Sequence, residues 1–171
     1  MTKYVCGSDK YLYDKGYIYL PIKLEKELPI EIEIENTKLY LKSSFHVSLL
    51  CTKNIFDKYP EKELENKIIT SFCNFISNKN ISLVKILNEF RFANSGERKT
   101  LIVRCEISYL NEFFKELSQE INMDIPLQPT HITLYTLQPD IGIGLNSFRE
   151  LEEKSIVVKV PDEIKDSLNL I

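Results

Sequence analysis

The two histidines of the chain occur in the same short pattern: His, an apolar residue, Ser or Thr, and then further apolar residues. In an extended strand, side chains two residues apart point to the same face. Each copy therefore places an imidazole beside a hydroxyl and turns the intervening apolar residue to the opposite face. The candidate active-site residues are His46 and Ser48 from the first copy, and His131 and Thr133 from the second.

This combination of side chains suits the cleavage of a phosphodiester. One proton must leave the attacking oxygen and another must reach the leaving oxygen, and a neutral and a protonated imidazole can do both near physiological pH. The hydroxyls of Ser48 and Thr133 can donate hydrogen bonds to the charge that develops on the phosphoryl oxygens. For either motif alone, the alternative is a histidine that is hydrogen-bonded in a protein core.

The paired motifs resemble those of the two-histidine (2H) phosphoesterase superfamily, which includes 2′-5′ RNA ligase-like proteins and cyclic nucleotide phosphodiesterases. The resemblance implies an α+β fold with two pseudo-symmetric lobes, mainly antiparallel sheets around a central cleft, and helices outside. It implies that His46 and His131 are catalytic and that Ser48 and Thr133 bind the substrate phosphate. Several RNA ligase-like members have a basic residue shortly after the second motif, where this chain has Leu134, Tyr135 and Thr136. The cation that would meet the phosphate is therefore unassigned.

No metal or other cofactor is expected. Catalytic zinc commonly has three protein ligands, and the two histidines lack a third ligand at a recognisable spacing such as His-Glu-x-x-His. The cysteines, at positions 6, 51, 73 and 105, contain no Cys-x-x-Cys pair. They indicate neither a zinc ribbon nor a disulfide framework, and reduced, mostly buried thiols are expected.

Other side chains are candidates for binding substrate. Tyr135 follows Thr133 by two residues, so strand periodicity predicts that it faces the cleft and stacks on a base, or else packs as an aromatic at the sheet edge. Four basic residues flank the predicted central strands, and each is either a partner for phosphate or an ordinary surface charge: Lys42, Lys53, Arg91 and Arg104.

The segment 140–144, DIGIG, resembles part of a phosphate-binding loop. Because it lacks both a third glycine and a Gly-Lys-Ser/Thr sequence, we interpret it as a flexible connection beside the site.

The length and composition indicate one domain, residues 1–171, and the resemblance implies that it has two lobes. The chain is 43% hydrophobic, which is enough for a sizeable core, and its net charge of −3 gives no overall attraction for nucleic acid. Neither a membrane-spanning run nor a signal-peptide core is seen, so a cytoplasmic location is expected. The protein is also expected to be a monomer.

Hydrophobic periodicity alternates between strand and helix along the chain. Strands are predicted at 17–22, 30–35, 38–42 and 156–160, with a hairpin of 83–92 and 100–108 around residues 94–97. Helices are predicted from Pro60 to about Asn78, at 110–121, and near 145–153.

The sequence thus predicts a metal-independent phosphodiesterase. The expected ligand is a nucleotide, a cyclic oligonucleotide or a short RNA end, carrying a 2′,3′-cyclic phosphate or a 2′-5′ or 3′-5′ linkage. A non-catalytic nucleotide-binding or sensing module that uses the same cleft is the alternative.

Overall fold

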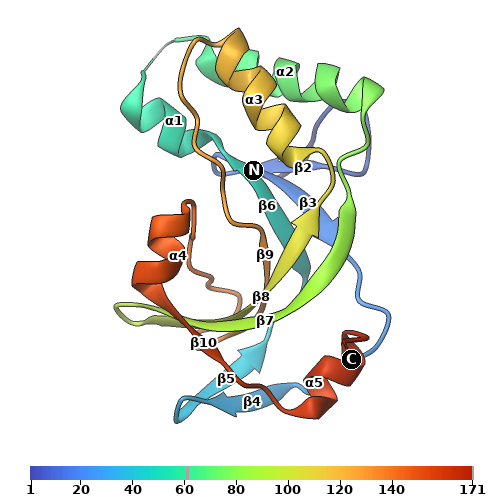
Figure 1. Cartoon of the computed structure of the whole chain (residues 1–171), viewed down its shortest axis with the longest axis vertical. Coiled ribbons are helices and arrows are strands. Elements are labelled where there is room, and N and C mark those ends of the chain that lie inside the picture. The colour runs from blue at the N-terminus through green and yellow to red at the C-terminus, as the bar shows by residue number, and fades with distance from the viewer. Residues whose placement is uncertain (61, 171) are drawn as a thin grey trace.

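A computed structural model describes residues 1–60 and 62–170, and within them the chain is an α+β protein with a large, open, antiparallel sheet (Figure 1). The main path of the sheet, in spatial order, is β1 (Lys3–Tyr4), β2 (Leu12–Asp14), β3 (Tyr17–Ile22), β6 (Phe45–Cys51), β9 (His131–Thr136), β8 (Arg98–Ile107), β7 (Leu83–Ser95) and β10 (Ser155–Val158). A hairpin of β4 (Glu31–Ile34) and β5 (Thr37–Leu41) joins β9 through β5. The predicted α+β class is confirmed.

Five helices lie in the described part of the chain: α1 (Thr52–Lys58), α2 (Leu64–Asn78), α3 (Leu110–Glu120), α4 (Phe148–Lys154) and α5 (Asp162–Ser167). The sequence predicted α2, α3 and α4, although it began α2 at Pro60 and the helix begins at Leu64. It missed α1 and α5 because both are short and lack a full amphipathic repeat. The predicted start of α2 included Glu61, which lies outside the described residues.

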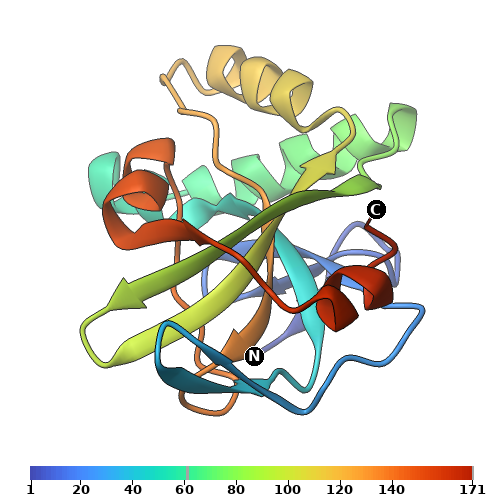
Figure 2. The same ribbon diagram turned by 60° about the horizontal axis from the view of Figure 1, so that its bottom comes forward.

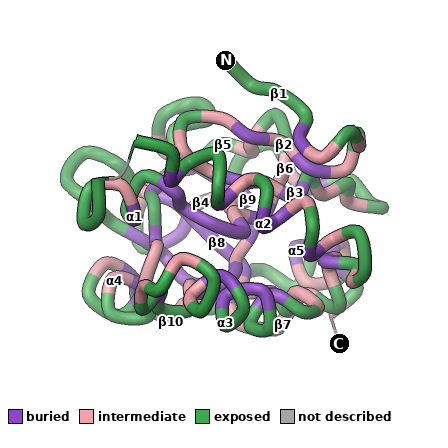
Figure 3. Tube along the Cα trace, turned by 90° about the horizontal axis from the view of Figure 1, so that it is seen from above, coloured by how far each residue is buried: buried purple, intermediate pink, exposed green. Residues whose placement is uncertain are grey.

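The two faces of the sheet are covered differently. On one face, apolar side chains of α2, α3 and α5 form the main core with Val47, Ile132 and other residues of the central strands. Phe72 and Phe113 tie α2 to α3, with ring centroids 5.3 Å apart. On the other face, a small cluster joins Ile102 of β8 to α4 and the segment before it. Figure 2 shows α4 apart from the α2–α3 pair, and Figure 3 shows buried residues gathered along the central strands.

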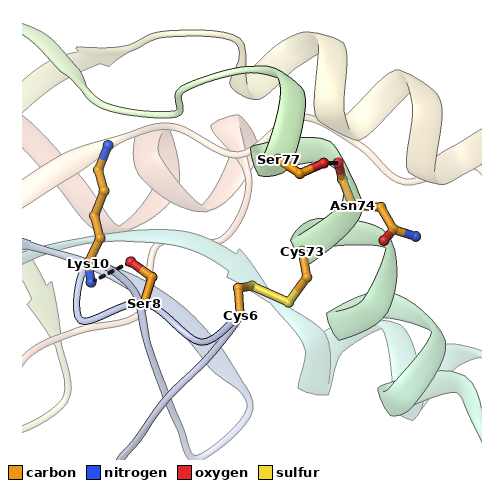
Figure 4. The surroundings of a disulfide bond; sticks show 6 residues. All are labelled: Cys6, Ser8, Lys10, Cys73, Asn74 and Ser77. Carbon is orange, nitrogen blue, oxygen red and sulfur yellow. Dashed lines mark hydrogen bonds between the residues drawn. A yellow bond between two sulfur atoms is a disulfide. The ribbon is translucent and has the colours of Figure 1, made fainter.

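One sequence expectation about the cysteines is wrong. Cys6, near the N-terminus, forms a disulfide with Cys73 of α2, as Figure 4 shows. The bond joins segments 67 residues apart, and scattered cysteines give no local signal for such a pairing. Cys51 and Cys105 are free and buried, as expected.

Among the described residues, no helix has both the length and the apolar character needed to cross a membrane.

Candidate active site

The two motif strands are direct neighbours at the centre of the sheet. Strands β6 and β9 are antiparallel, and the middle residues of the two motifs, Val47 and Ile132, are register partners. Extending this register by one residue in each direction places His46 opposite Thr133 and Ser48 opposite His131. The two motifs are therefore related by an approximate twofold axis through the Val47–Ile132 pair.

All four predicted site residues line one cavity of about 460 Å³. Val47 and Ile132 are fully buried on the opposite face, as the strand alternation predicts. The cavity lies on the sheet face that α2 and α3 leave uncovered, and the segment before α4 forms part of its wall.

Both motif strands carry a β-bulge directly after the motif hydroxyl. In β6, Ser48 pairs with Tyr19 and Leu50 with Ile18, so Leu49 is an extra residue. In β9, Thr133 pairs with Ile102 and Tyr135 with Leu101, so Leu134 is the extra residue. A bulge of this kind disrupts the alternation of side chains, and it turns both residues after each hydroxyl into the core.

Tyr135 is consequently not a base-stacking residue. Its side chain is fully buried, and its hydroxyl donates a hydrogen bond of 2.8 Å to the carbonyl oxygen of Pro29. Strand periodicity predicted the wrong face because the bulge at Leu134 shifts every later side chain. The packing alternative applies, although in the core rather than at a sheet edge.

Two other tyrosines that the sequence reasoning missed line the cavity. Tyr17 and Tyr19 of β3 are stacked, with ring centroids 5.6 Å apart and planes 8° apart. The edge of the stack contacts the first motif, because the Tyr19 ring centroid lies 4.3 Å from that of His46. Their alternate spacing in a predicted strand was visible, but the pairing of that strand with β6 was not.

Both imidazoles are neutral at pH 7 in the unliganded protein. Burial lowers the pKa of His46 to about 4, and the nearby ammonium of Lys42 adds to the effect. Burial also lowers the pKa of His131 to about 4, with further lowering by Arg104 and His46. The backbone carbonyl of Pro129 opposes this shift, although Nδ1 of His131 does not reach hydrogen-bonding geometry.

The cations at the cavity are Lys15, Lys42 and Arg98. They come from the β2–β3 turn, the β5–β6 connection and the start of β8, which are far apart in the sequence. Only Lys42 was among the predicted candidates.

The other three predicted cations have different positions. The Arg91 side chain is buried and binds Ser155 and two glutamates. Arg104 is the β8 register partner of His131, and its Nε donates a hydrogen bond of 3.0 Å to the Thr130 carbonyl. Lys53 is exposed and does not line the cavity.

The glycine-containing segment forms a wall of the cavity, so its predicted location beside the site is confirmed. One end is fixed by the Asp140 carboxylate, which accepts hydrogen bonds from Ser43 N (2.9 Å) and Ser43 Oγ (2.8 Å). At the other end, Asn146 donates its backbone N–H to Glu150 and its amide to the Tyr17 hydroxyl, at 2.8 and 3.2 Å.

Asn146 also borders a second, smaller cavity of about 320 Å³, between α1 and the segment 124–128. This cavity contains neither histidine.

Within residues 1–60 and 62–170, no three side chains of His, Cys, Asp or Glu come together as ligands for a metal ion.

Comparison of the chain with protein-family models, with curated proteins and with solved structures found no match in any of the three.

Proposed function

We propose that the protein is a metal-independent phosphodiesterase that cleaves a nucleotide phosphodiester by paired-histidine general acid–base catalysis. The observation that carries the proposal is the convergence of His46, Ser48, His131 and Thr133 on one cavity. The two histidines are 85 residues apart in the sequence, so their proximity depends on the tertiary fold. Each of the two segments contributes one imidazole and one hydroxyl to the cavity.

The chemistry requires one histidine to accept a proton from the attacking oxygen, which belongs to water or to a neighbouring ribose hydroxyl. The other histidine donates a proton to the leaving oxygen as the phosphorus–oxygen bond breaks. Ser48 and Thr133 donate hydrogen bonds to the phosphoryl oxygens. A bound phosphodiester supplies the negative charge that raises the imidazole pKa and so recruits the proton that the acid needs.

The bilobal 2H-like arrangement and the single two-lobed domain belong to this proposal. The approximate twofold axis and the matched bulges after Ser48 and Thr133 support it. In this arrangement, each half contributes one motif strand to the shared centre.

The candidate substrates are a 2′,3′-cyclic phosphate, a 2′-5′ or 3′-5′ linkage, and a small cyclic oligonucleotide. A monomer in the cytoplasm is part of the same prediction. The Cys6–Cys73 disulfide is more typical of oxidising compartments, so measuring its redox state in cells tests the location.

The alternative is a non-catalytic nucleotide-binding or sensing module. It is favoured by the neutral state of both imidazoles at pH 7, because an unliganded site with pKa values of about 4 holds no proton donor.

The deciding experiment is an activity screen in EDTA. It offers 2′,3′-cyclic mononucleotides, 2′-5′ and 3′-5′ oligonucleotides, and cyclic di- and trinucleotides side by side. The proposal expects turnover of at least one substrate by the wild type and its loss in His46→Ala and His131→Ala, with the fold checked by circular dichroism. Tight binding without turnover would support the sensing module, and activity that returned only with added zinc or manganese would contradict the metal-free mechanism.

A further inference from the structure

The cavity carries more positive charge than a single phosphodiester needs. Its lining includes Lys15, Lys42 and Arg98 against one carboxylate, that of Asp140. Asp140 is held by two hydrogen bonds from Ser43, and it has no ion pair among the described residues. A phosphodiester linkage has one negative charge, whereas the chain as a whole has a net charge of −3. The positive excess is therefore local to this cavity.

None of the three cations has an ion pair within the described part of the chain. Lys15 and Arg98 are exposed. Lys42 is partly buried and has its pKa lowered mainly by that burial, and the Asp140 carboxylate partly opposes this shift without reaching ion-pair distance. Three cations around one cavity, with a single carboxylate among them, repel one another, and a polyanionic ligand would relieve this repulsion.

The strand register places Lys15 and Arg98 at diagonally opposite ends of the site. Lys15 precedes Tyr17, which pairs with Cys51 at the end of β6 that lies beyond Ser48. Arg98 precedes Thr100, which pairs with Thr136 at the far end of β9, beyond Thr133. The histidines lie between these two ends.

Three other lining residues would contact different parts of a bound oligonucleotide: Lys42, Tyr17 and Tyr19. Lys42 and His46 line the same cavity, and the Lys42 charge adds to the lowering of the His46 pKa, so Lys42 is the candidate cation for the phosphate that reacts. Between the histidines and Lys15 lie the stacked rings of Tyr17 and Tyr19, and aromatic rings are common platforms for nucleobases.

We infer that the cavity binds an oligonucleotide with a phosphate on each side of the reacting one, with Arg98 and Lys15 as the contacts for the two flanking phosphates. This inference rests on the proposed function. The flanking contacts make the site select for chains of several phosphodiesters over a mononucleotide or a dinucleotide.

The test compares a dinucleotide, which has one phosphodiester, with a tetranucleotide of the same base and linkage, whose central phosphodiester is flanked on both sides. We expect the wild type to prefer the tetranucleotide in kcat/KM. Arg98→Ala and Lys15→Ala should each lower this preference about tenfold, mainly through KM, because each loses a charge-assisted contact. Each should also reduce the salt dependence of the tetranucleotide KM by roughly one phosphate contact.

Lys99→Ala is the matched control, since Lys99 neighbours Arg98 but does not line the cavity. Its preference should equal that of the wild type. An unchanged preference in both Arg98→Ala and Lys15→Ala, with cleavage intact, would overturn the inference and leave the proposed function standing.

Cleavage of none of the substrates in the EDTA screen would instead refute the proposed function. The inference is then decided by the binding of fluorescently labelled di- and tetranucleotides to the same variants. About tenfold weaker tetranucleotide binding in Arg98→Ala supports it, and equal affinity of the wild type for the two oligonucleotides overturns it.

Discussion

The two motif strands, β6 and β9, have the same geometry but different surroundings. Each presents an imidazole and a hydroxyl to the cavity, and each has its extra residue at the same place. The residue paired with the hydroxyl differs, because it is Tyr19 beside Ser48 and Ile102 beside Thr133. The cation that depresses the imidazole pKa is Lys42 for His46 and Arg104 for His131.

The proposed reaction uses some groups from both motif strands and others from one side of the cavity. The proton-transfer groups and phosphate donors are duplicated, as a symmetric cleavage site requires. The aromatic wall occurs on the β3 side, where Tyr17 and Tyr19 lie. In the proposed function, the reacting phosphate would thus meet the same imidazole and hydroxyl from each strand, while the rest of the substrate would meet two unlike sides.

The largest expected effect is the loss of either proton-transfer group. His46→Ala and His131→Ala should each lower kcat by a factor of about 10² to 10⁴ on the best substrate of the EDTA screen. The double variant should be little worse than the worse single one, because the two act as a unit. The equivalence of the two strands would be contradicted if the losses in kcat multiplied fully in the double variant. It would also be contradicted if one of the single variants kept the kcat of the wild type.

The two hydroxyls should matter less, and to a similar extent. Ser48→Ala and Thr133→Ala should each lower kcat by a factor of about 10 to 100, the cost of one hydrogen bond to a charged group. Steady-state kinetics measures both. A variant with unchanged kcat would show that its hydroxyl does not contact the phosphate in the transition state.

The next prediction concerns whether Tyr135 stabilises the core or contacts the ligand. Tyr135→Phe removes the hydrogen bond to Pro29 and should lower the free energy of unfolding by about 1 kcal/mol, measured by urea denaturation. Its kcat/KM should match that of the wild type, because the ring does not line the cavity. Unchanged stability together with an altered KM would place Tyr135 at the ligand instead.

The smallest expected effects are shifts of the two imidazole titrations, followed by NMR. Lys42→Ala should raise the pKa of His46, and Arg104→Ala should raise the pKa of His131, since each removes a nearby positive charge. Both shifts should leave the pKa well below 6.5, because burial is the largest cause in each case. Because His46 also lowers the pKa of His131, a downward shift of the other histidine is compatible with separate cations, whereas an upward shift of both histidines in either variant would mean that the two sites share their cations.

Much of the site could be predicted from the sequence because period-two alternation is local. That rule placed His46 and Ser48 on one face of a strand, and His131 and Thr133 likewise, as the cavity lining confirms. It failed at Tyr135, since a bulge depends on how two distant strands pair and leaves no mark in the strand's own residues.

Features that depend on tertiary pairing were missed for the same reason. Arg98 and Lys15 reach the cavity through the order of the strands, and nothing near either residue in the sequence resembles the motifs. The disulfide between Cys6 and Cys73 depends in the same way on where α2 packs. By contrast, the strand Tyr17–Ile22 was predicted with its observed ends, because its own alternation and flanking turn define it.

The most direct test of the central claim, paired-histidine acid–base catalysis, is the pH dependence of kcat/KM between pH 5 and 8. This parameter reports the free enzyme, in which both imidazole pKa values are about 4, so above pH 5 the one-proton form declines about tenfold per pH unit. We therefore predict that log kcat/KM falls with a slope of about −1 across this range, while the decline of kcat begins at higher pH because the bound phosphate raises the pKa of the acid. A kcat/KM that stays constant or rises with pH would contradict proton donation by a histidine of this pair.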